Sequence, residues 1–397
     1  MTRLSLKKVD PILFTIIVGL LIFGVLMVYD ASVVYAHDVF GGRYHFLLRQ
    51  LFWVVLGVIA ALLSFFSSEK TLRKISIFIF GFSMVSLVFL AIPKLFSFPL
   101  YDKFAPEVNG ARRWVILNPP DVIPPVPLLS RISFQPAELA KLSLILYYAN
   151  WFSSLSSPRR RRSSLLTEST ELPGLLTVLA LLGLVCFLVL LQPDFATTAM
   201  IAVIGLWVYF VAGAPLLLLL LSGLAVAFVG VIFIFISPYR RQRLLTFLDP
   251  HKADPLSAGY HLRQVLIALG SGGVFGVGLG ESRQKYGYLP EAAADSIFAI
   301  IGEELGFVGT SIVILAFALF LWRAFYVVRE TKNLFYKLVA GGVTGWIGVQ
   351  VLVNLGAMTG LIPLTGITLP LVSYGGSSMI FLMAGVGVLL RASTDMK

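Results

Sequence analysis

The stretch LLLLLLSGLAVAFVGVIFIFI, from Leu216 to Ile236, contains no charged residue and is long enough to cross a bilayer as one helix. Similar apolar stretches recur along the 397-residue chain, which is 58% hydrophobic and only 13% charged, with a mean hydropathy of +0.90. A soluble core could not bury so much apolar sequence. In lipid each segment must satisfy its own backbone hydrogen bonds, and the alternating strands of a membrane barrel are absent. The sequence therefore predicts an all-α polytopic membrane protein.

Ten membrane-spanning helices are expected from the apolar runs. They cover residues 11–29, 47–66, 75–92, 137–155, 172–191, 197–211, 216–236, 297–322, 338–358 and 377–390. The sixth and tenth are short for a hydrocarbon core of about 30 Å, so we expect them to extend by about a turn. We treat residues 1–397 as a single integral membrane domain, with two large loops at 93–136 and 237–296.

Basic residues in the short loops set the expected orientation. With the N-terminus inside, sixteen of the 31 basic residues are cytoplasmic: Arg3, Lys7, Lys8, Lys70, Arg73, Lys74, Arg159 to Arg162, Arg323, Arg329, Lys332, Lys337, Arg391 and Lys397. The run Arg159 to Arg162 is interpreted as a topology anchor, with a site for lipid headgroups or a partner as the alternative. Both termini are therefore expected in the cytoplasm, and the two large loops outside.

Charge and composition exclude several classes of function. The net charge of +11 is spread over loops on both faces, and no nucleic-acid-binding signature accompanies it. The single cysteine, Cys186, cannot form an internal disulfide, and the four histidines lack metal-ligand spacing. We therefore expect no nucleic-acid partner and no structural zinc site.

The second large loop carries basic and glycine-rich segments. Arg240, Arg241 and Arg243 follow the seventh span, where guanidinium groups suit either phosphate binding or anchoring to lipid headgroups. Residues 266–285 contain six glycines and are expected to form a re-entrant or surface-lying segment. The spacing of these glycines matches no nucleotide-binding loop, so coupling to ATP is not supported.

Carboxylates gather in YLPEAAADSIFAIIGEELG, from Tyr288 to Gly306. Glu291 and Asp295 would share one face if a helix already runs there, with Glu303 and Glu304 about two turns deeper. Burial or neighbouring arginines would shift the pKa of such acids and tune them for proton transfer. The alternative is that Asp295 caps the following helix.

Other ionisable residues lie at the same end of the predicted bundle. Glu138 and Lys141 are three residues apart in the fourth span and can form an ion pair, while Asp194 follows the fifth span. Charges at such depth are costly and usually functional. The alternative is a structural polar contact between helices.

Several motifs together resemble the shape, elongation, division and sporulation family, which includes FtsW and RodA. In chain order they are NGARRWV (109–115), FQPAELAKL (134–142), QPD (192–194), YRRQR (239–243) with DP (249–250), GSGG (270–273), GLGESRQKYGYLPEAAAD (278–295) and TGITLPLVSYGGSS (365–378). Their order covers nearly the whole chain, and the spelling is closer to the FtsW and SpoVE branch. The chain departs from the usual pattern at Asp30, Gly287, Ala293, Ala294 and Ser296.

This resemblance implies a peptidoglycan glycosyltransferase of the bacterial cytoplasmic membrane, involved in cell division or cell shape. Such an enzyme polymerises lipid II on the outer face, releases undecaprenyl pyrophosphate and works with a class B penicillin-binding protein. The family's essential aspartate falls on Asp295. A lipid II flippase or a scaffold that recruits other wall enzymes are the competing hypotheses, although no internal transporter repeat is visible.

Roles for individual residues follow from the residues and the resemblance together. Asp295 is the expected general base, supported by Glu291. Arg240, Arg243 and Lys285 are candidates to neutralise the pyrophosphate. The remaining candidates for substrate binding are Arg113, Trp114, Glu138, Lys141, Asp194, Ser373 and Tyr374. A divalent cation, Mg²⁺ or Mn²⁺, is compatible with these carboxylates but is not required by them.

Overall fold

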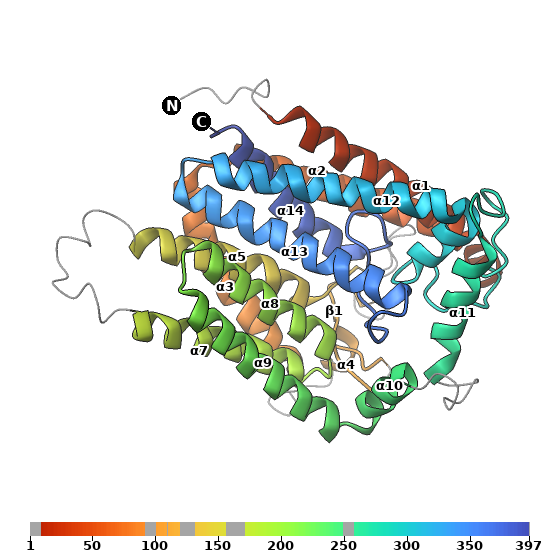
Figure 1. The fold of residues 1–397 in the computed structure, drawn as a ribbon, viewed down its shortest axis with the longest axis horizontal. Helices are drawn as coiled ribbons and strands as arrows, with labels where there is room; N and C mark the ends of the chain where they lie inside the picture. Colours follow the sequence, from red (N-terminus) through yellow and green to blue (C-terminus); the bar gives the residue numbers. More distant parts are fainter. Residues whose placement is uncertain are drawn as a thin grey trace.

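The computed structural model describes residues 9–91, 101–108, 110–119, 132–155, 171–248 and 258–396. Within these residues, ten long helices run side by side in a bundle (Figure 1). They are α1 (Pro11–Phe40), α2 (His45–Phe66), α3 (Glu69–Ala91), α5 (Pro136–Leu155), α7 (Glu171–Leu190), α8 (Phe195–Val211), α9 (Leu216–Ile236), α12 (Ile297–Glu330), α13 (Leu334–Met358) and α14 (Gly376–Ser393). The shorter elements are α4 (Tyr101–Phe104), α10 (Pro238–Leu248), α11 (Ala258–Ser271) and the antiparallel strands β1 (Val115–Ile116) and β2 (Ser133–Phe134).

The long helices confirm the all-α, polytopic prediction, and each coincides with one predicted span. In the described part of the chain, seven helices are long and apolar enough to cross a membrane, and two more are shorter apolar helices. The chain is therefore a multi-pass integral membrane protein. The predicted end of the first span at residue 29 was wrong, because polar residues interrupt the apolar run there without breaking the helix. The helix ends instead at Gly41, whose left-handed backbone lets its N–H bond the His37 carbonyl.

Helix α13 occupies the centre of the bundle. It packs against α5, α8, α12 and α14, and Trp346 on this helix is fully buried. Glycines allow these close approaches: a Cβ at Gly345 would collide with the ring of Trp207, and one at Gly342 with Ile145. By contrast, α9 lies at the edge of the bundle (Figure 1) and packs mainly against α8 and α10. Its many exposed leucines suit contact with lipid.

Both termini lie at one end of the bundle (Figure 1), as an even number of spans requires. At this end the Asp10 backbone N–H donates to the Ser393 hydroxyl at 3.1 Å, so the first and last helices meet. The Arg323 guanidinium of α12 also pairs with the Asp10 carboxylate at 2.6 Å. Helices α10 and α11 lie toward the opposite end, with the loops that carry the predicted site residues.

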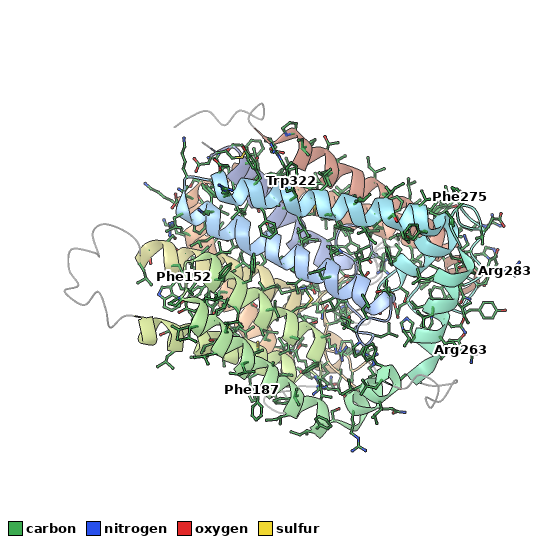
Figure 2. All side chains as sticks on the ribbon, in the orientation of Figure 1. Phe152, Phe187, Arg263, Phe275, Arg283 and Trp322 are labelled. Carbon is green, nitrogen blue, oxygen red and sulfur yellow. The ribbon has the colours of Figure 1, made fainter. Side chains whose placement is uncertain are left out.

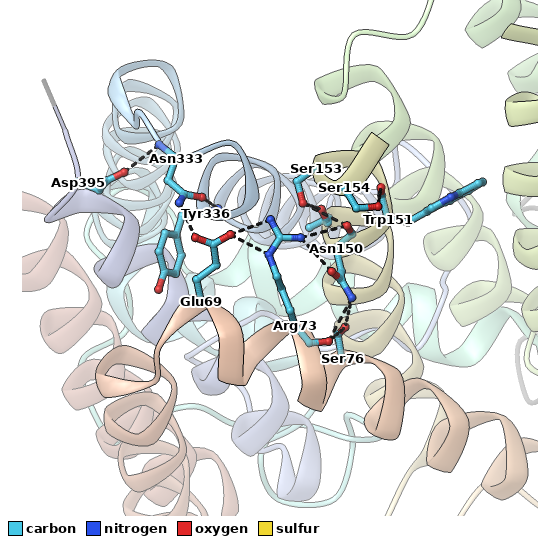
Figure 3. Close-up of polar contacts among 11 residues, drawn as sticks. Glu69, Arg73, Ser76, Asn150, Trp151, Ser153, Ser154, Asn333, Tyr336 and Asp395 are labelled. Carbon is cyan, nitrogen blue, oxygen red and sulfur yellow. Dashed lines mark hydrogen bonds and ion pairs between the residues drawn. The ribbon is translucent and has the colours of Figure 1, made fainter. Parts of the chain in front are cut away.

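A polar cluster joins several helices at the end that holds the termini (Figure 3). The Arg73 guanidinium bonds the Glu69 carboxylate at 2.7 Å and the Asn150 side-chain oxygen at 2.9 Å. The Asn333 amide donates to Glu69 at 2.7 Å, and the Asp395 carboxylate accepts from the Asn333 backbone N–H at 2.8 Å. These contacts connect α3, α5, the start of α13 and the C-terminal residues. The basic run Arg159 to Arg162 and the basic residues Arg3, Lys7 and Lys8 lie outside the described residues.

Candidate functional site

Asp295 lies in the loop that joins α11 to α12, two residues before the helix begins. Its carboxyl group is largely buried, with 7% of the residue exposed. The N-cap of α12 is Ser296, and no side chain in the described part of the chain makes a capping hydrogen bond there. Asp295 is therefore not the helix cap, and its carboxylate is left for another use.

Two neighbouring elements fix the backbone around Asp295. The side-chain amide of Asn354, which is fully buried in α13, donates to the Asp295 carbonyl at 2.8 Å and to the Ile367 carbonyl at 2.7 Å. The Tyr374 backbone N–H donates to the Ala293 carbonyl at 2.8 Å. The loop after α13 therefore lies directly against the loop that carries Asp295.

Glu291 does not share a helical face with Asp295, because the helix has not yet begun. Its backbone is left-handed, with φ of 51°, and its carbonyl accepts from the N–H groups of Ala294 and Ser296 at 2.9 and 3.2 Å. Burial, together with repulsion from Glu291, raises the pKa of Asp295 to about 7. The hydroxyl of Ser296 and the charge of Arg243 oppose it. The structure therefore holds a carboxyl group that titrates near neutral pH beside a cation.

His261, which the sequence analysis left without a role, lies next to this carboxyl group. Its Nε2 is 2.7 Å from the Ser296 hydroxyl, which in turn donates to Asp295 Oδ1 at 3.4 Å. Burial, together with the charge of Arg243, lowers the pKa of His261 to about 4. The histidine is therefore neutral at physiological pH. Spacing gave no signal for it, since His261 and Ser296 are 35 residues apart.

Glu303 and Glu304 anchor the preceding loop to α12. The Glu303 carboxylate accepts from the Ser282 hydroxyl and from the backbone N–H of Arg283 at 3.1 Å. The Glu304 carboxylate accepts from the Ser282 backbone N–H at 3.1 Å and from the Lys285 ammonium at 2.9 Å. Both glutamates are almost completely buried. Their contacts hold the loop against α12.

Lys285 is engaged with two carboxylates. Its ammonium lies 2.9 Å from both Asp30 Oδ1 and Glu304 Oε1, and its side chain is 2% exposed. Although burial opposes the charge, hydrogen bonds to both carboxylates give a net increase in the pKa of Lys285. In this arrangement the ammonium faces protein carboxylates rather than an open surface.

The glycine-rich segment packs backbone to backbone against α12. The helix is interrupted at Gly306, with φ of 66° and ψ of −161°. The N–H groups of Val277 and Gly278 donate to the carbonyls of Glu303 and Glu304 at 3.0 and 3.1 Å. A Cβ at Gly306 would collide with the Gly276 nitrogen. The glycines therefore permit a close approach, while side chains such as Phe275, 81% exposed, point outward (Figure 2).

Glu138 and Lys141 form the expected ion pair, at 2.7 Å, inside the bundle. Lys141 is 1% exposed, and its ammonium also lies 5.0 Å from the centre of the Trp346 ring. Among the residues that the structure describes, none forms a hydrogen bond with the second oxygen of Glu138. Glu138 lines a small pocket together with Gln350 and the loop residue Ser373.

Arg113, Asp194 and Arg240 form a second polar group. The Asp194 carboxylate caps α8 through the Thr197 backbone N–H at 3.2 Å. The Arg113 guanidinium donates to the Pro193 carbonyl at 2.7 Å. The pKa of Arg240 is lowered by burial and by the charge of Arg113, while Asp194 acts in the opposite direction.

The remaining predicted residues lie on or near these groups. Trp114 is 37% exposed and directly precedes β1. The Ser373 hydroxyl accepts from the Leu369 backbone N–H at 2.8 Å, and its carbonyl accepts from the Gln50 side chain at 3.3 Å. Arg243 donates to the Leu364 carbonyl at 3.2 Å. The structure thus joins Asp295, Glu291, Arg243 and Tyr374, and places Glu138 by Ser373, but separates Lys285 into its own ion cluster.

Comparison with known protein families identifies the family of this chain. A family model described as cell cycle protein, FtsW/RodA/SpoVE, matches residues 11–397. The chain belongs to the FtsW/RodA/SpoVE family. The resemblance read from the sequence motifs is therefore confirmed.

Relatives within the FtsW/RodA/SpoVE family are similar over almost their full length. A probable peptidoglycan glycosyltransferase FtsW of Idiomarina loihiensis is 37% identical over 387 residues, covering 96% of this chain and 86% of the relative. Stage V sporulation protein E of Bacillus subtilis is 36% identical over 399 residues, covering 98% and 99%. These similarities agree with the expected placement near the FtsW and SpoVE branch.

Solved structures of family members share the fold. A chain from the structure reported as structural coordination of polymerization and crosslinking by a peptidoglycan synthase complex has a TM-score of 0.72 and 27% identity, with 98% of both chains covered. The rod shape determining protein RodA of Thermus thermophilus has a TM-score of 0.65 and 27% identity, with 98% and 97% covered. The ten-helix arrangement is therefore the fold of the FtsW/RodA/SpoVE family.

Proposed function

We propose that this chain is a peptidoglycan glycosyltransferase that polymerises lipid II at the outer face of the bacterial cytoplasmic membrane. The observation that carries the proposal is the buried Asp295 carboxyl group, with a pKa of about 7, in a family whose members bear that name. A general base works best when its pKa lies near the operating pH. Asp295 meets this requirement and lies beside an arginine that suits an anionic substrate.

In the proposed reaction Asp295 accepts the proton of the acceptor sugar's 4-hydroxyl group. The hydroxyl oxygen then forms a bond to the donor's anomeric carbon, while the bond from that carbon to the pyrophosphate oxygen breaks. Undecaprenyl pyrophosphate leaves with the bonding electrons. Glu291 supports Asp295 by raising its proton affinity through charge repulsion.

Arginines supply the positive charge that the leaving pyrophosphate requires. We assign this role first to Arg243, whose charge acts on both Asp295 and His261. Arg240 and Arg113 act on one another and lie beside Asp194, so they suit a neighbouring phosphate or sugar subsite. Lys285 contributes by holding its loop through Asp30 and Glu304, and not by touching the substrate.

The inner polar residues shape the space available to the substrate. Glu138 and Lys141 lie below the loop that contains Ser373 and Tyr374, and that loop contacts the backbone beside Asp295. Trp114 offers a partly exposed ring for a sugar or a lipid tail. We propose that these residues orient lipid II for the reaction.

A divalent cation is compatible with this arrangement. Among the described residues no group of three or more His, Cys, Asp or Glu side chains is placed to hold a metal. Mg²⁺, however, commonly uses one or two carboxylates together with substrate phosphates. In this arrangement Mg²⁺ or Mn²⁺ would be held mainly by the substrate's own pyrophosphate, and the cation would help to neutralise the pyrophosphate charge.

The proposed orientation places the termini in the cytoplasm and the Asp295 loop outside. Arg73, Arg323 and Arg391 lie at the end of the bundle that holds the termini, which agrees with the positive-inside rule. The expected partner is a class B penicillin-binding protein that crosslinks the new strands. The structural similarity to a chain of a peptidoglycan synthase complex supports this choice.

The test is a gel assay for glycan polymer with the purified protein in liposomes, fluorescent lipid II, and the partner present or absent. Wild-type protein should form polymer, and Asp295→Asn, which keeps the shape but cannot accept the proton, should not. A folded Asp295→Asn protein that polymerises at the normal rate would refute the assignment of the base. A wild-type protein that only moves lipid II between leaflets would establish a flippase instead, and one that only activates other enzymes a scaffold.

A further inference from the structure

The Ser296 hydroxyl is diverted from its usual role at the start of a helix. A serine at the N-cap normally accepts a hydrogen bond from a backbone N–H in the first turn. At the start of α12 no such bond forms. Instead the hydroxyl lies 2.7 Å from His261 Nε2 and 3.4 Å from Asp295 Oδ1. The hydroxyl therefore links a side chain of α11 to the carboxyl group that we assign as the base.

We propose that His261 is a positioning residue for Asp295 and acts through the Ser296 hydroxyl. This inference rests on the proposed function of Asp295 as general base. A hydroxyl has one proton, so donation to Asp295 Oδ1 leaves the Ser296 oxygen free to accept from His261 Nε2–H. The chain of donors then runs from His261 through Ser296 to Asp295, and it favours the ionised carboxylate.

This arrangement leaves the second carboxylate oxygen for the substrate. Oδ1 is held by Ser296, whereas Oδ2 faces Gly366 in the loop after α13. A Cβ on Gly366 would lie 3.8 Å from Oδ2. Ser296 therefore does not occupy Oδ2, and in our proposal the acceptor hydroxyl approaches Oδ2 while Oδ1 stays fixed.

The histidine orients the carboxylate rather than relaying its proton. Burial, together with the charge of Arg243 from α10, lowers the pKa of His261 to about 4. The pKa of Asp295 is about 7, under the influence of burial, Glu291 and Arg243. A proton taken from the substrate is therefore more stable on Asp295 than on His261. The imidazole stays neutral throughout, and its contribution is to fix the direction of the Ser296 hydroxyl.

Three variants test this role. Ser296→Ala removes the donor to Asp295. His261→Phe keeps an aromatic ring but loses Nε2, which releases the hydroxyl to cap α12. His261→Gln retains an amide N–H near the position of Nε2 and should restore the contact. The matched control is His37→Phe, because His37 is an exposed histidine near the C-terminal end of α1 whose side chain hydrogen-bonds to that of Asp38, its one polar side-chain contact among the described residues.

The measurement is the pH dependence of lipid II polymerisation by the full-length protein with its partner. Loss of a donor to the carboxylate raises its pKa, so the acidic limb of the rate profile should move to higher pH. In Ser296→Ala and His261→Phe the rate at pH 6 should fall by about threefold to tenfold, with less change at pH 8. His261→Gln and His37→Phe should follow the wild-type profile. The variant that combines Ser296→Ala with His261→Phe should lose no more activity than the more damaging of the two single variants, since both substitutions act through one hydroxyl.

Other results would overturn the inference. An acidic limb that stays in place in both Ser296→Ala and His261→Phe would show that the hydroxyl does not act on Asp295. Equal losses at all pH values, or additive losses in the double variant, would indicate a purely structural effect. These outcomes bear on His261 only when the wild-type protein is active and Asp295→Asn is inactive. If the wild type forms no polymer, the proposed function fails first, and the two failures remain distinguishable.

Discussion

Replacing Lys285 by methionine should destabilise the protein strongly, because it leaves two carboxylates without their cation. The ammonium lies 2.9 Å from oxygens of both Asp30 and Glu304. At this distance, with an effective dielectric constant of about 20, each contact has a Coulomb energy of about 6 kcal/mol before desolvation is subtracted. The Glu304 side chain is fully buried, so solvent cannot replace the lysine there, whereas the Asp30 side chain is 21% exposed and solvent can replace the lysine only in part. Removing one partner from a buried pair typically costs about 3 to 5 kcal/mol.

The assay is thermal unfolding of the purified protein in detergent, followed by intrinsic fluorescence. Lys285→Met should lower the unfolding temperature by roughly 5 to 10 °C. Glu304→Gln should cost less, because the contact between Lys285 and Asp30 remains and the amide oxygen can still accept from Ser282. The double variant should recover part of the loss, since it leaves only the partly exposed carboxylate unpaired.

A different result would refute the reasoning. If Lys285→Met unfolds at the wild-type temperature but forms no polymer, the ammonium does not hold the loop. The sequence-based hypothesis that Lys285 neutralises pyrophosphate would then be favoured. A Glu304→Gln variant as unstable as Lys285→Met would show that the glutamate's other contacts dominate the cluster.

Three further predictions concern other parts of the molecule. Because burial raises the pKa of Asp295 to about 7, the polymerisation rate should fall as pH decreases through 7. The protonated form of Asp295 stabilises the folded protein below about pH 4, and this contribution is lost as pH rises toward 7. At pH 8 Asp295→Asn should therefore unfold at a higher temperature than wild type. An unchanged unfolding temperature at pH 8 would contradict the shift. Gly306→Ala should lower the unfolding temperature and cost more than about 1 kcal/mol of stability, since its positive φ and the close Gly276 backbone exclude a Cβ. Gly183→Ala is the control, because a Cβ on Gly183 meets no atom within 4 Å. Equal effects of the two substitutions would contradict this explanation. Arg73→Ala should destabilise more than Lys74→Ala, which alters an exposed neighbour, and equal unfolding temperatures would show that the polar cluster of Figure 3 contributes little.

The helical fold was predictable because lipid imposes a simple rule on sequence. An apolar run such as 216–236 must form an α-helix when no water can satisfy its backbone hydrogen bonds, so each predicted span matches a helix. The end of α1 was not predictable in the same way. Residues after Tyr29 are polar enough to end an apolar run, yet nothing stops the helix before Gly41. Hydropathy locates the membrane, whereas capping and steric effects locate helix ends.

The candidate site was predictable in part. The carboxylates of residues 288–306 stood out because acids are rare in so apolar a chain, and the ion pair of Glu138 with Lys141 followed from their spacing. The contact of His261 with Ser296 joins residues 35 positions apart through tertiary packing. Likewise, Lys285 meets Asp30 across 255 positions. No local pattern encodes such contacts, so they required the three-dimensional structure.

The backbone contacts between the glycine-rich segment and α12 also affect how the protein can diverge. Carbonyls and N–H groups are the same for every amino acid, so the outward side chains of this segment take no part in holding it. Val274, Phe275, Val277 and Leu279 are all exposed, and each can change without moving Asp295. Gly276 and Gly306 have no such freedom. The outer surface of this segment can therefore vary to suit new neighbours, while the backbone contacts that hold the segment against α12 stay the same.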